Sequence, residues 1–223
     1  MIEVRFHGRG GQGAVVASEV LASAAFKMGY EVSAFPFFGV ERRGAPVTAF
    51  ARIDKKPIRI RSSIYEPDII VVLDSSLMRG VDVLEGLKTG GIVLINYPDG
   101  KKLEGMPAKF SYFVVDATAI AVAHGLGSPT APIVNTAIMG AFARACNIVS
   151  IDTILASIRE EAPVKQDGNV AAARQAFDQL PDASRDAGPV QRPADPGLRH
   201  VRAGAEGQLG RDQDQRSRLS VFT

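Results

Sequence analysis

The apolar residues of this chain recur with two periods, one typical of strands and one typical of helices. Residues 2–6 alternate between apolar and charged side chains, which predicts a short strand. Residues 14–28 then run without a helix breaker to Gly29, and glycine is common just beyond a helix C-terminus. The chain is therefore expected to open with a strand, a loop and a helix.

The rest of the chain continues this alternation. Residues 69–73 are continuously apolar, as in a central parallel strand, and apolar residues at helical spacing predict a helix over 77–88. Two alternating runs, 47–53 and 58–61, flank a short polar turn and predict a hairpin. The other predicted strands are 30–35, 92–95 and 112–115, and the other predicted helices are 117–124, 132–146, 151–161 and 168–180.

Strands that alternate with helices predict an α/β fold, a Rossmann-like open, mostly parallel sheet with helices on both faces. The hairpin is expected to add an antiparallel edge. We expect one domain over residues 1–180. Residues 181–223 differ in kind, because they hold seven arginines, no lysine and almost no apolar periodicity. Such a segment cannot bury enough surface to fold alone. It is either a disordered tail or the product of a shifted reading frame, and we assign it no function.

The loop after the first strand carries a pattern typical of phosphate binding. Glycines at 8, 10 and 13 have the spacing G-x-G-x-x-G between the predicted strand and helix. Gly8 and Gly10 would allow a tight turn and the close approach of a ligand, and Gly13 would allow the helix to pack tightly against the strand. The amides at the helix N-terminus would then face an anion.

The dinucleotide fingerprint also requires a carboxylate at the tip of the second strand, where it holds the ribose. Here that strand ends in Phe35-Pro36-Phe37-Phe38, and Glu31 lies at its start. A nicotinamide cofactor is therefore only one interpretation of the glycines. The other is a tight strand-to-helix turn without a ligand.

Open α/β sheets bind ligands beyond the carboxyl ends of their strands, near the switch in strand order. We therefore expect loops 7–13 and 37–46 to lie around one crevice with residues Asp74-Ser75-Ser76 and Asn96. Asp74 could instead cap the helix that follows it, and Asn96 could serve the turn that follows it.

Arg42 and Arg43 lie in the second of these loops. Their forked donors could hold phosphate or carboxylate groups, or could pair with acids of a partner subunit. His7 lies beside the glycine loop, but a lone histidine there is more often a hydrogen-bonded loop residue than an acid or base. We assign no catalytic and no metal-binding residue. The candidate binding residues are Gly8, Arg9, Gly10, Gly11, Gln12, Gly13, Arg42 and Arg43.

Composition argues against several classes of protein, namely nucleic-acid-binding, membrane, disulfide-bonded and iron–sulfur proteins. The net charge of +2 is spread along the 223 residues, which gives no reason to expect nucleic acid or a charged membrane surface as partner. No apolar run approaches the length needed to cross a bilayer. The single cysteine, Cys146, cannot form an internal disulfide or bind an iron–sulfur cluster or structural zinc alone. We expect a soluble, cytoplasmic protein.

Several segments carry a resemblance to a known family. The segments 4–13, 35–47, 61–68 and 169–174 resemble the 2-oxoacid:acceptor oxidoreductase gamma family, in particular the gamma subunits of pyruvate:ferredoxin oxidoreductases. The likeness spans about residues 1–180. The segments His-Gly-Arg-Gly-Gly-Gln-Gly and Phe-Gly-Val-Glu-Arg-Arg-Gly-Ala-Pro-Val together are far more specific than the glycines alone.

The resemblance implies a subunit of an enzyme that oxidatively decarboxylates a 2-oxoacid with coenzyme A, giving acyl-CoA, carbon dioxide and reduced ferredoxin. It implies alpha, beta and delta subunits as partners, with thiamine diphosphate, Mg and iron–sulfur clusters on those chains. This chain would be a non-redox subunit that is inactive alone, and the isolated chain could form a homodimer. Which 2-oxoacid is used would be decided on the partner chains.

Coenzyme A is our candidate ligand for the glycine loop, because it carries a pyrophosphate and the loop lacks the ribose carboxylate. Two alternatives stay open at this point. One is a free-standing NAD(P)-dependent oxidoreductase, and the other is a purely structural assembly subunit whose glycine loop holds a partner.

Overall fold

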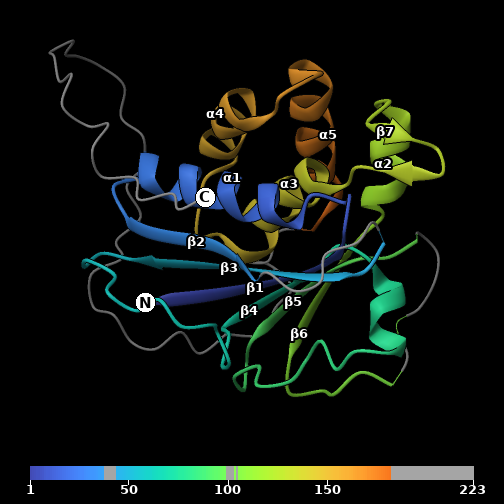
Figure 1. The fold of residues 1–223 in the computed structure, drawn as a ribbon. Helices are drawn as coiled ribbons and strands as arrows, with labels where there is room; N and C mark the ends of the chain where they lie inside the picture. The colour runs from blue at the N-terminus through green and yellow to red at the C-terminus, as the bar shows by residue number, and fades with distance from the viewer. Residues whose placement is uncertain (38–43, 99–102, 104, 182–223) are drawn as a thin grey trace, which may run out of the picture.

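A six-stranded sheet organises the computed structural model, which describes residues 1–37, 44–98, 103 and 105–181 (Figure 1). Its strands lie in the order β2-β3-β1-β4-β5-β6. A separate small hairpin is formed by β7 and β8. The strands are β1 (Ile2–Arg9), β2 (Glu31–Phe37), β3 (Pro46–Asp54), β4 (Ile69–Val72), β5 (Ile92–Asn96), β6 (Ser111–Val115), β7 (Gly127–Ser128) and β8 (Ala131–Pro132).

Only β3 runs against the other strands of this sheet. It pairs antiparallel with both β1 and β2, whereas β1, β4, β5 and β6 pair in parallel. After β1 the chain crosses to β2 at one edge, and after β3 it returns to β4 on the other side of β1. The switch in strand order therefore lies between β1 and β4, and the predicted mostly parallel α/β sheet with an antiparallel edge is confirmed.

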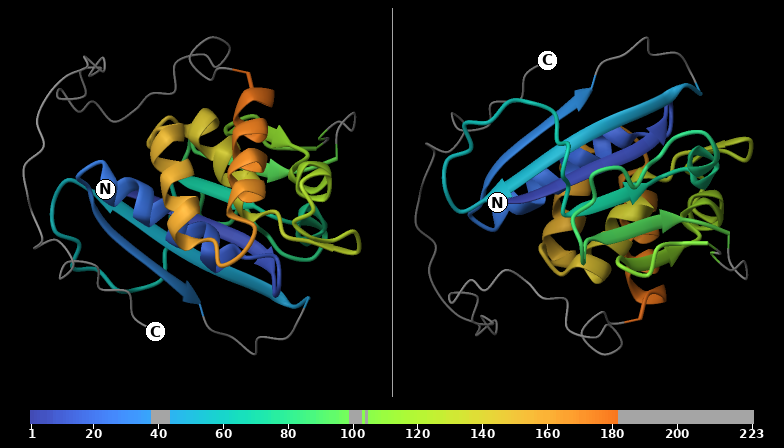
Figure 2. Two further views of the ribbon diagram at one scale, coloured as in Figure 1. Left: turned by 90° about the horizontal axis from the view of Figure 1, so that it is seen from above. Right: turned by 90° about the horizontal axis from the view of Figure 1, so that it is seen from below.

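The α-helices gather over one face of the sheet (Figures 1 and 2). They are α1 (Ala14–Lys27), α2 (Ala117–Ala123), α3 (Asn135–Cys146), α4 (Ile151–Glu161) and α5 (Gln166–Gln179). Alternate residues of β4 divide between two cores, as expected for a strand covered on both faces. Val71 packs with the α-helices, whereas Ile70 and Val72 pack with Leu77 and Leu87. None of the described helices is long and apolar enough to cross a bilayer.

The second face is covered by a short 3-10 helix, η1 (Ser75–Arg79), and by turns, where a helix over 77–88 was predicted. That prediction is wrong in its extent, although Leu77 and Leu87 are buried as their spacing implied. Gly80 ends the 3-10 helix. Gly86 has a φ of 72°, and a Cβ there would lie 1.9 Å from the carbonyl oxygen of Tyr65. The close approach of residues 65–66 thus imposes a conformation that a helix cannot provide.

The predicted hairpin of 47–53 with 58–61 is also wrong. β3 already pairs on both sides, with β1 and β2, so no strand edge is left for residues 58–61. The antiparallel edge is instead formed by β2 and β3. Residues 58–61 have no regular secondary structure.

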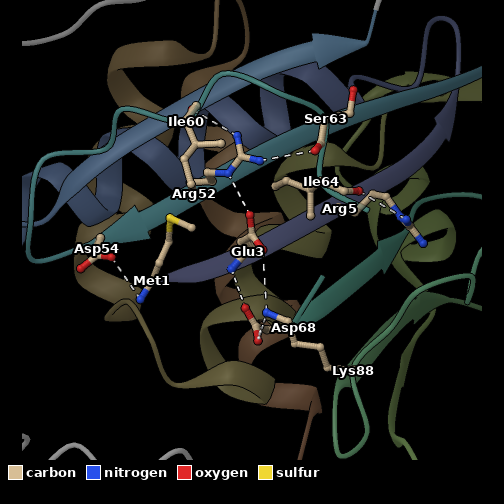
Figure 3. A network of polar contacts seen from close by, with 10 residues as sticks. All are labelled: Met1, Glu3, Arg5, Arg52, Asp54, Ile60, Ser63, Ile64, Asp68 and Lys88. Carbon is tan, nitrogen blue, oxygen red and sulfur yellow. Dashed lines mark hydrogen bonds and ion pairs between the residues drawn. The ribbon is translucent and has the colours of Figure 1, made fainter. Parts of the chain in front are cut away.

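A buried ionic network fastens this irregular segment to the sheet (Figure 3). Arg52 on β3 is 2% exposed and donates to Glu3 Oε1 on β1 at 2.9 Å. Its other nitrogens reach the carbonyl oxygens of Ile60 at 3.3 Å and Ser63 at 3.5 Å. These two carbonyl oxygens thus accept from a side chain instead of from a strand ladder.

Candidate functional site

The glycine loop connects the carboxyl end of β1 to the N-terminus of α1, next to the switch between β1 and β4. Gly11 and Gly13 have φ values of 97° and 82°, in the left-handed region that favours glycine. Gly8 lies within β1, and a Cβ there would lie 3.2 Å from the Cβ of Ala14. For Gly13 the expected close neighbour was the strand, but the nearest atoms belong to Asn135 of α3. Gly13 is therefore required because α1 approaches α3 closely at this point, and not because α1 approaches the strand.

Gln12 fixes the shape of the loop. Its amide donates to the carbonyl oxygen of Arg9 at 3.0 Å, and its side-chain Oε1 accepts from the Arg9 amide at 2.8 Å. Its Nε2 donates to Asp74 Oδ2 at 3.0 Å. Gln12 therefore closes the turn and ties it to Asp74, two residues beyond the end of β4.

Arg9 is held from three directions. Its Nε lies 3.0 Å from Asp74 Oδ2, and its terminal nitrogens donate to the carbonyl oxygen of Gly44 at 3.0 Å and to Ser76 Oγ at 2.9 Å. Its side chain is 33% exposed. The positive charge thus lies at the rim of the loop, oriented by the protein and still open to solvent.

Asp74 serves both as the cap that the sequence suggested and as part of the crevice. Its Oδ1 accepts from the Ser76 amide at the start of η1. Burial alone would raise the pKa of this carboxyl, but hydrogen bonds from Ser76 and Gln12 and the charge of Arg9 outweigh it and lower the pKa. Asp74 therefore stays a carboxylate and holds the loop as a charged acceptor.

The second predicted loop also reaches the glycine loop. The Gly10 amide donates to the carbonyl oxygen of Ala45 at 2.9 Å, and the Gly44 amide donates to that of Gly10 at 3.0 Å. Arg42 and Arg43 lie outside the described residues, so their predicted role stays a prediction. The sequence had not singled out the backbone of Gly44 and Ala45, because backbone contacts leave no residue signature.

Asn96 contributes to the same edge of the sheet as a structural residue. Its Nδ2 donates to the carbonyl oxygen of Leu73 at 2.8 Å and to Thr118 Oγ1 at 2.9 Å. Its Oδ1 accepts from the Thr118 amide at 3.2 Å. It links the ends of β4 and β5 to the start of α2, so its polar atoms are occupied within the protein.

The electrostatics of the loop favour an anion. The N-cap of α1 is Gly13, which offers no side-chain acceptor, and the first turn of α1 contains no acid. The first amides of a helix have no intrahelical partner, and the helix dipole adds partial positive charge there. This end of α1 therefore provides amide donors and partial positive charge for a phosphate, next to Arg9, whose own charge is paired with Asp74.

The described residues offer no group of three or more His, Cys, Asp or Glu side chains that could hold a metal ion. Cys146 is buried, and burial raises the pKa of its thiol well above the usual range. His7 lies in β1, buried, with its Nε2 accepting from Arg5 Nε.

Comparison with known proteins identifies the family. A profile of pyruvate ferredoxin/flavodoxin oxidoreductases matches residues 3–179. The chain belongs to this family. The "Pyruvate/ketoisovalerate oxidoreductases common subunit gamma" of Thermococcus kodakarensis is 56% identical over 183 residues, which cover 79% of this chain and 96% of that protein. The "Pyruvate synthase subunit PorC" of Methanothermobacter thermautotrophicus is 50% identical and covers 81% of this chain and 96% of its own length.

A crystal structure in the pyruvate ferredoxin/flavodoxin oxidoreductase family supports the fold. The pyruvate oxidoreductase subunit PORC of Thermotoga maritima superposes with a TM-score of 0.67 at 35% identity, covering 81% of this chain and 97% of that one. The resemblance on which the sequence analysis relied is therefore confirmed. The relatives that this chain covers over 96% of their length are gamma or PorC subunits. This finding disfavours the alternative of a free-standing NAD(P)-dependent enzyme.

Proposed function

We propose that this chain is the gamma subunit of a multisubunit pyruvate or 2-oxoacid:ferredoxin oxidoreductase and that its glycine loop binds coenzyme A. The complex would convert a 2-oxoacid and coenzyme A into acyl-CoA, carbon dioxide and reduced ferredoxin in the cytoplasm. Family membership and the gamma and PorC relatives, 96% of whose length the chain covers, support the subunit role.

In this proposal the chain carries no redox centre. Thiamine diphosphate, Mg and the iron–sulfur clusters belong to the alpha, beta and delta partners, and ferredoxin takes the electrons from the complex. The chain's only cysteine supports this division, because cluster ligation requires several cysteines on one site.

The observation that carries the coenzyme A proposal is the uncapped N-terminus of α1 beside the braced guanidinium of Arg9. These groups match the pyrophosphate of coenzyme A. The strand next to β1 on this side is the antiparallel β3, and β2 lies beyond it at the sheet edge. The tip of β2 is therefore not beside the loop, where a nicotinamide dinucleotide needs its ribose carboxylate.

The test uses the assembled complex with the full chain. A double variant, Arg42→Ala with Arg43→Ala, is compared with Arg159→Ala, which removes an exposed arginine of α4. We expect the KM for coenzyme A to rise in the double variant, the KM for the 2-oxoacid to stay unchanged, and the α4 variant to behave like the wild type. An unchanged KM for coenzyme A in the double variant would overturn the proposal and leave a scaffold role.

A further inference from the structure

The N-termini of α1 and α3 meet at the candidate site. A Cβ on Gly13, the N-cap of α1, would lie 2.5 Å from Nδ2 of Asn135, the first residue of α3. Neither helix has a side-chain cap or an acid in its first turn. By contrast, α2 and α4 are capped by Asp116 and Ser150, and α5 has Asp167 in its first turn. The two helices whose N-termini have neither a capping N-cap side chain nor an acid are the two whose N-termini lie together.

Asn135 adds a side-chain donor at this junction. It is 6% exposed, and its Oδ1 accepts from the Thr136 amide at 2.8 Å. This bond fixes which end of the side-chain amide faces Gly13. Nδ2 has no hydrogen-bond partner within the described part of the chain. Among the described residues, Ser157 Oγ is the one side-chain atom that has neither a hydrogen-bond partner nor contact with solvent. Asn135 Nδ2 also has no partner among these residues, so it must have some contact with solvent.

An unpaired donor in such a buried place is costly unless a ligand or water completes it. We propose that Asn135 Nδ2 contacts the diphosphate of coenzyme A, with one phosphate facing the N-terminus of α1 and the other that of α3. This rests on the proposed function and adds a recognition residue that the sequence analysis did not identify. A diphosphate matches two adjacent helix N-termini better than a single phosphate does.

The decisive variant is Asn135→Asp, measured in the assembled complex with the full chain. Aspartate keeps the shape and the acceptor for the Thr136 amide, and its charge is favourable at a helix N-terminus, so the fold should persist. It loses only the donor and places a negative charge against the phosphates. The matched control is Asn147→Asp, the same change at the exposed C-cap of the same helix.

We expect Asn135→Asp to raise the KM for coenzyme A by roughly tenfold or more, the effect of losing a hydrogen bond to a charged group. Asn147→Asp should leave it at the wild-type value. Pantetheine has the thiol of coenzyme A but no diphosphate, so kcat/KM with pantetheine as acyl acceptor should be the same in wild type and Asn135→Asp. A fall with both acceptors would show a merely structural role and overturn the inference.

The two proposals fail differently. If the double variant at Arg42 and Arg43 raises the KM for coenzyme A but Asn135→Asp does not, the amide binds only water and the inference is wrong while the proposed function stands. If neither change affects the KM, the coenzyme does not occupy this loop and both proposals are wrong.

Discussion

Arg5 donates a hydrogen bond from Nε to Nε2 of His7 across 3.0 Å, and both side chains are buried, at 8% and 7% exposure. Because Nε2 accepts this bond, the neutral ring carries its proton on Nδ1. Burial, with the charge of Arg5 as a smaller cause, lowers the pKa of His7 to about 4. The histidine beside the glycine loop is therefore a neutral acceptor that orients Arg5, and its position is not evidence of acid–base chemistry.

The first prediction concerns stability against pH. The unfolded chain takes up a proton on His7 near pH 6.5 and the folded chain only near 4, so the unfolded state binds more protons between these values. The free energy of unfolding therefore decreases as pH falls, and His7 accounts for up to about 2 kcal/mol of this decrease between neutral pH and about pH 5. Urea denaturation of wild type and His7→Gln at both pH values measures this, with His124→Gln as the control. Equal losses on acidification in wild type and His7→Gln would exclude His7 as the source.

The second prediction concerns Asp74, the common acceptor of Arg9, Gln12 and the Ser76 amide. Asp74→Ala should lower the free energy of unfolding by about 1–2 kcal/mol, as for other lost caps, and raise the KM for coenzyme A because the loop loses its brace. Asp116→Ala removes the corresponding cap of α2 and should lower stability without affecting that KM. A rise in KM in both variants would mean that loss of stability alone explains it.

Local pattern was enough to predict most elements of the fold. The apolar run at 69–73 became the buried strand β4, and the breaker-free run ending at Gly29 became α1, because both depend on neighbouring residues alone. The position of the glycine loop beside Asp74 could also be predicted, from the order of strands and loops along the chain. Parallel strands end at one edge, so residues after successive strands had to meet there.

The features that could not be predicted from the sequence depend on interactions between segments far apart in the chain. Residues 58–61 alternate like a strand, but β3 had no free edge, and Arg52 donates to the carbonyl oxygen of Ile60 instead. The sequence analysis did not identify Asn135 for a related reason. Its proposed role rests on its contact with Gly13, more than a hundred positions earlier in the chain, and a single asparagine in an apolar run gives no sign of such a contact.

The third prediction tests the packing that holds α3 in place. A Cβ on Gly140 would lie 1.8 Å from the carbonyl oxygen of Ala173 on α5. Alanine gains up to about 1 kcal/mol in helix propensity, but a backbone atom cannot move aside as a side chain can. Gly140→Ala should therefore lower the free energy of unfolding by about 1–3 kcal/mol, the usual cost of overpacking. Gly80→Ala, with nothing within 4 Å, should change it little. Wild-type stability in Gly140→Ala would contradict the close packing of α3 on α5.

The fourth prediction concerns the ion pair between buried Arg52 and partly buried Glu3, drawn in Figure 3. Arg52→Leu removes the 2.9 Å partner of Glu3, leaves the more distant Lys88 Nζ at 3.7 Å, and takes the Arg52 donors away from two carbonyl oxygens. Removing one partner of a fully buried pair costs about 3–5 kcal/mol, because it leaves a desolvated charge. Glu3 is 16% exposed and keeps Lys88, so we expect a loss toward the lower end of that range.

The matched control for this change is Arg159→Leu. It removes an equal charge from a surface pair in which Arg159 is 55% and Asp167 92% exposed. Solvent screens such a pair, so the loss should be below about 1 kcal/mol. Denaturant titrations of both variants give the comparison. Similar losses in the two would mean that water already reaches the charges around Glu3 and that the segment between β3 and β4 is held by other contacts.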